Sequence, residues 1–179
     1  MKILFLGSSK FSVQSLKTLS ESENIIGVVC PPDKPAGRGL QLKAPLIKEV
    51  AIELGLSVFQ QESINTPEFL AKLKTLAPEL IVVVSFGQIL SNEILNYPKN
   101  GCINLHPSLL PKYRGPAPIQ WAIANGEKTT GVTTIFLIDT VDSGDIILQR
   151  PVEIKFTDSY EILSERLAKE GAIVLKETI

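Results

Sequence analysis

Two polar side chains that can hold a developing negative charge stand two positions apart, at Asn104 and His106. His106 is the only histidine in the chain, and it follows the short run Cys102–Leu105, which is typical of a β-strand. Because residues two apart on a strand point to the same side, the amide and the imidazole can face one pocket. Such a pair suits the stabilisation of an oxyanion during acyl transfer. The alternative is a histidine satisfied by backbone groups at the end of a strand.

The segment from Pro107 to Pro118 contains four prolines. Each proline fixes its own φ, so this segment is expected to be stiff. A stiff loop beyond a strand holds chemical groups in place at little entropic cost, which favours a site. A plain connector is the alternative, although connectors rarely surround an apolar pair such as Leu109-Leu110 with so many prolines.

Three aspartates, Asp139, Asp142 and Asp145, lie in or beside a segment rich in Asp, Ser and Gly. One interpretation is an ordinary turn, for which Asp and Gly are common residues. The other is a carboxylate that meets His106, where it would favour the charged imidazole or take a proton from an attacking amine. The spacing alone does not choose among the three aspartates.

Two glycine-containing segments could bind anions. Arg38 stands between two glycines in the segment Pro31–Gly39, and such an arginine could bind phosphate or carboxylate. The alternative is that this segment is a solvated surface loop. Gly7-Ser8-Ser9 follows the first apolar run and could hold phosphate at the start of a helix. Because this turn lacks the GxGxxG pattern, no dinucleotide cofactor is expected.

The elements that must position these residues alternate between strand and helix. Alternation of this kind predicts an α/β fold with a doubly wound, mostly parallel sheet that binds ligands beyond the carboxyl ends of its strands. Two later β-rich runs, Gly131–Ile138 and Ile146–Ile154, predict an antiparallel edge, and Ser159–Lys176 predicts a closing helix. The predicted parallel strands are Ile3–Leu6, Asn24–Cys30, Ser57–Phe59, Leu80–Ser85 and Cys102–Leu105, and the predicted helices between them are Phe11–Leu19, Leu46–Leu56, Pro67–Leu76 and Pro116–Ala124.

The composition is that of one globular domain, with 44% hydrophobic and 21% charged residues among 179. A formal net charge of −1 provides no overall field for a nucleic acid, so any such contact must be local. Cys30 and Cys102 form no CxxC pattern, and with a single histidine they predict no metal site and a reducing, cytoplasmic location. The apolar run at the N-terminus is too short for a membrane span.

Several of these motifs, in this order, resemble one family. The segments Asn104–Pro111, Gly115–Pro118 and Gly131–Thr133 are similar to those of the formyltransferases that use 10-formyltetrahydrofolate. The segment Asp33–Gly39 resembles the corresponding loop of the methionyl-tRNA formyltransferases within that family. One departure is Ser8-Ser9-Lys10, where the family usually has Thr-Pro-Glu.

The resemblance implies a Rossmann-like domain over residues 1–179 and a role for each matching residue. It implies that Asn104, His106 and Asp142 are catalytic and that Arg38 approaches the aminoacylated end of the tRNA. It implies 10-formyltetrahydrofolate as the formyl donor, with no metal. The folate-binding residues that it implies are Phe86, Gly87, Gln88, Ile89, Leu90, Ser108, Leu109, Leu110 and Pro111.

The expected function is therefore formyl transfer to the amino group of initiator methionyl-tRNA, for translation initiation. The alternatives are a formyltransferase for a small amine, such as a glycinamide ribonucleotide or an amino sugar, a formyltetrahydrofolate hydrolase, and a non-catalytic folate- or nucleotide-binding module. We expect a monomer without membrane contact. We also expect the family's C-terminal tRNA-binding domain, which makes most of the tRNA contact, to lie outside this chain.

Overall fold

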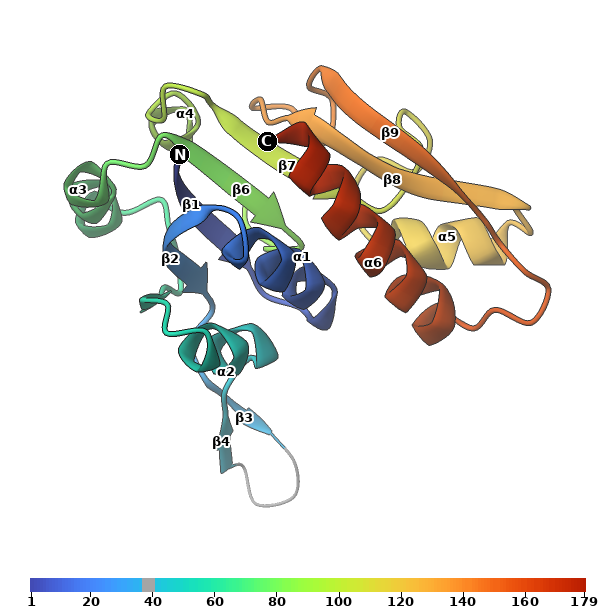
Figure 1. The fold of residues 1–179 in the computed structure, drawn as a ribbon, viewed down its shortest axis with the longest axis horizontal. Coiled ribbons are helices and arrows are strands. Elements are labelled where there is room, and N and C mark those ends of the chain that lie inside the picture. The colour runs from blue at the N-terminus through green and yellow to red at the C-terminus, as the bar shows by residue number, and fades with distance from the viewer. Residues whose placement is uncertain (37–40) are drawn as a thin grey trace.

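The computed structural model describes residues 1–36 and 41–179, in which seven strands form one sheet. These strands are β1 (Lys2–Gly7), β2 (Asn24–Cys30), β5 (Val58–Gln60), β6 (Leu80–Val84), β7 (Cys102–His106), β8 (Thr129–Phe136) and β9 (Ile146–Glu153). Their order is β5-β2-β1-β6-β7-β8-β9 (Figure 1). The first five strands in this order are parallel to one another, whereas β8 pairs antiparallel with both β7 and β9. The predicted α/β fold with an antiparallel edge is confirmed.

Helices cover both faces of this sheet. They are α1 (Lys10–Ser20), α2 (Leu46–Glu53), α3 (Pro67–Leu76), α4 (Asn92–Leu95), α5 (Pro118–Ala124) and α6 (Tyr160–Thr178). One apolar cluster joins α1, α2, α5 and α6 to one face, and a second joins α3 and α4 to the other. The doubly wound prediction is therefore confirmed.

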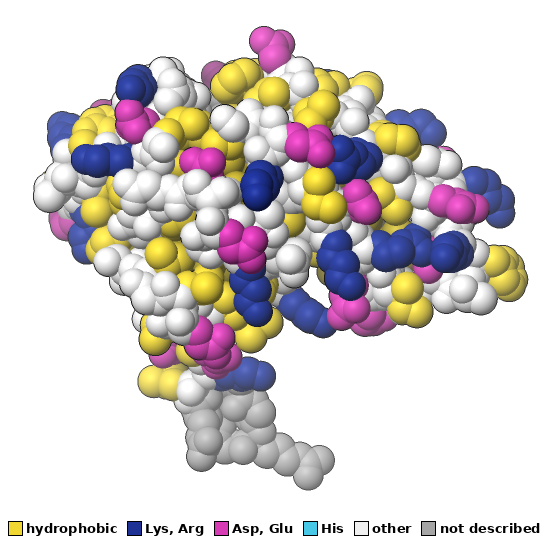
Figure 2. Space-filling view, viewed as in Figure 1, with side chains coloured by type: hydrophobic (Ala, Val, Ile, Leu, Met, Phe, Trp, Pro, Cys, Tyr) yellow, Lys and Arg dark blue, Asp and Glu magenta, His cyan; other side chains and the backbone are white. Residues whose placement is uncertain are grey.

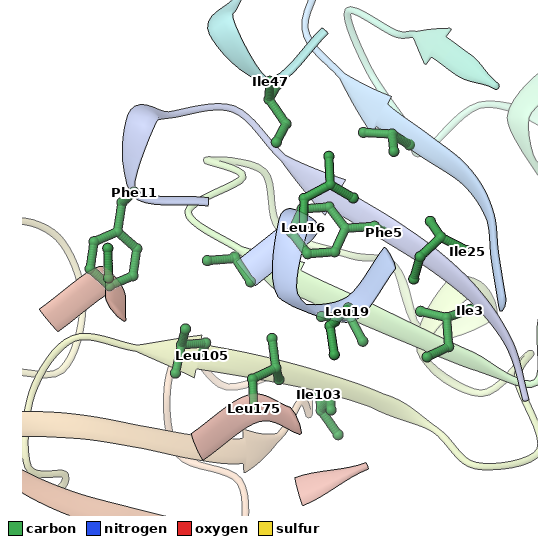
Figure 3. Close-up of a cluster of buried hydrophobic side chains, with 14 of the residues drawn as sticks. Ile3, Phe5, Phe11, Leu16, Leu19, Ile25, Ile47, Ile103, Leu105 and Leu175 are labelled. Atoms are coloured by element: carbon green, nitrogen blue, oxygen red, sulfur yellow. The ribbon is translucent and has the colours of Figure 1, made fainter. Parts of the chain in front are cut away.

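The central strands are apolar because both of their faces are covered. Every residue of β6 is buried, as expected for a parallel strand between two helical layers. In β1, Ile3 and Phe5 belong to one apolar cluster and Leu4 and Leu6 to the other. Figure 3 shows Phe5 packed among the side chains of α1 and its neighbours.

The closing helix α6 lies beside α1 and reaches β7, the strand that carries Asn104 and His106 (Figure 1). A β-carbon placed on Gly171 of α6 would lie 2.7 Å from Leu105 Cδ2. The missing side chain therefore lets the helix approach β7 closely. This packing supports the strand from the face where Leu105 is buried.

The structure corrects one predicted boundary, adds elements that were not predicted and leaves one predicted residue untested. The helix predicted from Pro116 begins at Pro118, because Ala117 has φ +57° and cannot belong to a right-handed helix. The hairpin of β3 (Lys34–Ala36) and β4 (Gln41–Lys43) and the short helix α4 were not predicted. Arg38 falls among residues 37–40, which lie outside the described part of the chain.

Basic and acidic side chains are interspersed on the face drawn in Figure 2. This agrees with a formal net charge of −1 and with the absence of a single-sign field from the composition. Among the described residues, none of the helices is both long enough and apolar enough to cross a lipid bilayer.

Candidate active site

A cavity of about 560 Å³ lies at the carboxyl ends of the central parallel strands. This is where open α/β sheets bind their ligands, and the volume is in the range of small-molecule sites, roughly 300–1,000 Å³. The residues that line it are Ser8, Ser9, Phe11, Val83, Ser85–Leu90, Leu95, Asn104–Pro107, Gly115–Gln120, Leu137–Asp139, Val141, Asp142 and Tyr160.

Asn104, His106 and Asp142 meet at the wall of this cavity. Asn104 Nδ2 is 3.3 Å from Asp142 Oδ1, and His106 Nδ1 is 3.4 Å from Asp142 Oδ2. The side chains of His106 and Asp142 are only 6% and 11% exposed. The expectation that strand alternation turns Asn104 and His106 to one side agrees with this geometry, while the catalytic roles of the three residues stay predictions.

The ring of His106 is fixed from its other side. Its Nε2 lies 2.8 Å from the backbone oxygen of Tyr113. Because a carbonyl oxygen can only accept a hydrogen bond, Nε2 carries a proton. Nδ1 then faces the carboxylate of Asp142. A proton on Nδ1 would give the ring a second hydrogen bond, to the carboxylate of Asp142.

Asp142 is placed by its backbone as much as by its partners. It has φ +46°, a conformation that costs a non-glycine residue about 1 kcal/mol or more. Gly115 N donates to Asp142 Oδ2 at 2.9 Å. Two residues on, a β-carbon at Gly144 would lie only 1.8 Å from the backbone oxygen of Phe136. Glycine is therefore required at 144, and the chain can turn Asp142 towards His106.

The segment Ser108–Pro111 is hydrogen-bonded to the side chain of Thr133 in β8. The Thr133 hydroxyl donates to Ser108 O at 2.6 Å and accepts from Leu110 N at 3.2 Å. Gln149 Nε2 lies 3.0 Å from the same hydroxyl and 2.8 Å from Leu110 O. None of residues 108–111 is among the described residues lining the cavity, so their predicted folate contact stays a prediction.

Sequence reasoning missed Thr133 and Gln149 as supports of this loop. Thr133 belongs to the Gly131–Thr133 motif, so a signal was present without a role attached to it. The register of the antiparallel edge supplies that role, because it pairs His106 with Thr133 and Thr133 with Gln149.

Residues Phe86–Leu90 all line the cavity, and the strand-end loop that contains them is held from outside. Gln88 Nε2 donates to Glu62 O at 3.1 Å, and its Oε1 accepts from Ile64 N at 3.1 Å. Asn65 Nδ2 donates to Ile89 O at 2.8 Å, and its Oδ1 accepts from Ser91 N at 2.9 Å. The Gln88 side chain is therefore hydrogen-bonded to the neighbouring loop, and the folate contact of this segment stays a prediction.

The Gly7-Ser8-Ser9 turn joins β1 to the same strand-end loop. Ser8 N donates to Ser85 O at 3.1 Å, and the Ser8 hydroxyl donates to the same oxygen. Ser9 Oγ donates to Ser85 Oγ at 2.9 Å. In this structure the serines that depart from the family pattern tie the ends of β1 and β6 together at the cavity.

The antiparallel pair of β3 and β4, which stand on either side of residues 37–40 in the sequence, is anchored near Asp33. Lys48 Nζ lies 2.8 Å from both carboxylate oxygens of Asp33, and Gln60 Nε2 donates to Asp33 Oδ1 at 2.7 Å. The hydrogen bonds from Lys48 and then Gln60 lower the pKa of Asp33 below its ordinary value of 3.8. Asp33 is therefore charged at neutral pH, and it holds the base of the hairpin against α2 and β5.

The cysteines and the carboxylates provide no metal centre in the described part of the chain, where no group of three potential ligands occurs. Both cysteines are free and buried. Burial raises the pKa of Cys30 to about 11 and that of Cys102 to about 12. Each thiol is therefore protonated at neutral pH.

Solved structures share this fold. Glycinamide ribonucleotide transformylase 1 from Symbiobacterium toebii superposes with a TM-score of 0.83 over 100% of this chain and 85% of that one, at 22% sequence identity. Phosphoribosylglycinamide formyltransferase from Streptococcus pneumoniae TIGR4 gives a TM-score of 0.83 over 99% and 96%, at 20% identity. At these identities the likeness is one of fold.

Relatives in sequence are closer. A protein named methionyl-tRNA formyltransferase from Thermodesulfovibrio yellowstonii is 53% identical over 178 residues, which cover 99% of this chain and 58% of that protein. Another of the same name, from Caldanaerobacter subterraneus subsp. tengcongensis, is 50% identical over 100% of this chain and 59% of its own length. The chain thus spans somewhat more than half the length of these relatives. A family model described as formyl transferase matches residues 1–179, and the chain therefore belongs to the formyl transferase family.

Proposed function

We propose that this chain transfers the formyl group of 10-formyltetrahydrofolate to the amino group of initiator methionyl-tRNA, for translation initiation. The observation that carries the proposal is the meeting of Asn104, His106 and Asp142 at the wall of the strand-end cavity. The names of relatives at 53% and 50% identity support methionyl-tRNA as the acceptor. The translational role makes the cytoplasm the expected location.

The cavity fits a folate donor in its chemistry. Phe86 and Leu90, both buried, are apolar parts of its wall, and Gly87 leaves open space where a side chain would stand. A flat heteroaromatic ring can therefore lie against apolar side chains and reach the backbone groups of this loop. When bound, 10-formyltetrahydrofolate supplies the activated formyl carbon that an amine attacks.

Asn104 and His106 would stabilise the charge that develops on the formyl oxygen. His106 Nε2 is committed to Tyr113 O at 2.8 Å, but the contacts of His106 Nδ1 and Asn104 Nδ2 with Asp142 are 3.4 and 3.3 Å. These two contacts are longer than ordinary hydrogen bonds of about 2.9 Å. The Asn104 amide can therefore turn to a substrate oxygen at small cost, whereas the His106 ring stays on Tyr113 O and can share its Nδ1 proton with a substrate oxygen that lies beside Asp142. One such donor is typically worth about 3 kcal/mol in the transition state.

Asp142 would keep the imidazole charged and take the proton that the attacking amine loses. Its carboxylate lies beside both donors, so the proton can pass towards the leaving nitrogen of the folate without a long transfer. A covalent route through Ser108 has no support, because this residue is fully buried and its hydroxyl donates to Lys112 O at 2.7 Å.

The decisive experiment compares three acceptors for the formyl group: methionyl-tRNA, glycinamide ribonucleotide and water. The chain is assayed alone and fused to the C-terminal remainder of the Thermodesulfovibrio yellowstonii relative, because it spans only 58% of that protein. We expect transfer to methionyl-tRNA, weak with the chain alone and strong with the fusion. Faster transfer to glycinamide ribonucleotide, or formate release that needs no acceptor, would replace the proposed function with one of the alternatives.

A further inference from the structure

Three consecutive residues, Tyr113, Arg114 and Gly115, contact both members of the His106–Asp142 pair. Tyr113 O accepts from His106 Nε2 at 2.8 Å. Arg114 Nε donates to the backbone oxygen of Asp142 at 3.0 Å, and Gly115 N donates to the Asp142 carboxylate at 2.9 Å. This turn therefore links the end of β7 to a residue that lies 27 positions further along the chain than Gly115.

The turn is itself anchored on the side away from Asp142. The Tyr113 hydroxyl donates to Glu127 Oε1 at 2.8 Å and accepts from Asn125 Nδ2 at 3.0 Å. Lys112 Nζ adds an ion pair with Glu127 at 3.0 Å. The hydrogen bonds from Lys112 and Tyr113 lower the pKa of Glu127, so this acceptor is charged at neutral pH. The turn thus has a fixed base on the segment between α5 and β8.

Arg114 is the one member of the turn whose side chain reaches Asp142. Its side chain is exposed, and it is not among the described residues that line the cavity. Its Nε nevertheless holds the backbone of Asp142, whose φ of +46° is an unfavourable conformation. The guanidinium therefore acts from outside the cavity on the backbone that aims the carboxylate at His106.

We infer that Arg114 is a positioning residue for formyl transfer, which holds the Asp142 carboxylate against His106 by fixing the Asp142 backbone. The inference rests on the proposed function for its kinetic consequence. Its geometric consequence is independent of that function, because the His106–Asp142 contact exists without substrate. Without the Arg114 bond, the Asp142 segment is held to the turn by Gly115 N alone, and the carboxylate can move away from His106 Nδ1.

The kinetic test uses Arg114→Met, which keeps the apolar stem and removes the guanidinium. We expect kcat to fall about 10- to 100-fold, the cost of a misplaced catalytic group, while the KM for each substrate changes little. In Arg114→Ala, added guanidinium ion at millimolar concentration is expected to restore part of the lost kcat. The control is Lys128→Ala, which removes another exposed cation and should leave kcat unchanged.

If Arg114 instead contacted a phosphate of the tRNA directly, its variants would show the opposite pattern. The KM for methionyl-tRNA would rise with a steep salt dependence while kcat is retained. That result would overturn the inference.

The structural readout is the ring of His106, whose NMR signals are unambiguous because it is the only histidine. In Arg114→Met, we expect the proton on Nδ1 to shift or broaden, while the proton on Nε2, bonded to Tyr113 O, stays. Unchanged signals from both ring protons in a folded variant would overturn the inference. If the unmodified chain and its fusion transfer no formyl group, the proposed function fails, and the ring signals still decide whether Arg114 positions the pair.

Discussion

The ends of β6 and β7 lie side by side at one cavity, but they present different groups to it. After β6, Gln88 is turned to the neighbouring loop and Asn65 supports the segment from outside, so backbone and apolar surface face the cavity. At the end of β7, buried polar groups such as Thr133 hold the chain, and the side chains of Asn104 and His106 face the cavity. We propose that the β6 end recognises the ligand and that the β7 end acts on it.

This difference predicts that variants at the two ends change different quantities. Disturbing the β7 end should lower the rate of the chemical step and leave folate affinity nearly intact. Disturbing the β6 end should weaken folate binding and leave the rate with bound substrate nearly intact. A variant that changes both quantities equally would contradict the comparison.

The largest effect is expected for His106→Ala at the β7 end. The variant removes a donor that would stabilise the formyl oxygen, so kcat should fall about 10²- to 10³-fold. Steady-state transfer to methionyl-tRNA measures the loss, and fluorescence titration with a folate measures binding, which should change less than about threefold. Near-normal turnover would remove His106 from the mechanism.

The next largest effect is expected on stability, for Thr133→Val, because this variant removes a buried hydroxyl with three hydrogen-bond partners. Losing these bonds leaves Leu110 N and Ser108 O unsatisfied, and we expect the free energy of unfolding to fall by about 2 kcal/mol. Urea unfolding measures this change. The matched control is Thr130→Val on the same strand, whose buried hydroxyl has no partner in the described part of the chain. That variant should be neutral or stabilising, and equal losses in the two variants would show that the bonds around Thr133 contribute little.

Asn65→Ala should act on the β6 end. It removes the two hydrogen bonds that hold residues 89 to 91, each with a net worth of about 1 kcal/mol. We expect the folate KM to rise about fivefold and kcat to be retained. Asn96→Ala is the control, because Asn96 is also exposed and its side chain makes no hydrogen bond within the described residues. A fall in kcat with unchanged KM would reverse the assignment of the two strand ends.

The smallest effect is expected at the opposite end of β7, where Cys102 lies. Burial raises the pKa of Cys102 to about 12 and that of Cys30 to about 11, so at pH 8 both are almost wholly unreactive thiols. Iodoacetamide should therefore modify neither in the native protein and both in denaturant, as mass spectrometry can measure. Rapid native-state modification would show that the strands open at these positions.

Local rules were enough to predict much of the framework. The apolar run Leu80–Ser85 predicted a buried central strand, and alternation along β7 predicted that Asn104 and His106 face one pocket. These predictions depend on neighbours in the sequence, which is why they needed no knowledge of the rest of the chain. The predicted start of α5 at Pro116 was wrong, because the left-handed conformation of Ala117 is set by the turn around it.

The remaining features depend on contacts between distant residues. The sequence could not choose Asp142 over Asp139 and Asp145 from spacing, because the choice depends on Gly144 fitting against Phe136 and on a bond from Gly115. The family resemblance supplied that choice. Asn65 and Gln149 carried no local signal, since their partners lie 24 to 26 and 16 to 39 residues away.

The most direct test of the central claim is single-turnover formyl transfer by Asp142→Asn, measured together with the folate dissociation constant. Asparagine keeps the size of the side chain and removes the charge that faces His106. We expect the rate constant with saturating, bound folate to fall at least about 100-fold while the dissociation constant stays within about threefold. A near-normal rate constant with weakened folate binding would contradict the claim that the β7 end performs the chemistry.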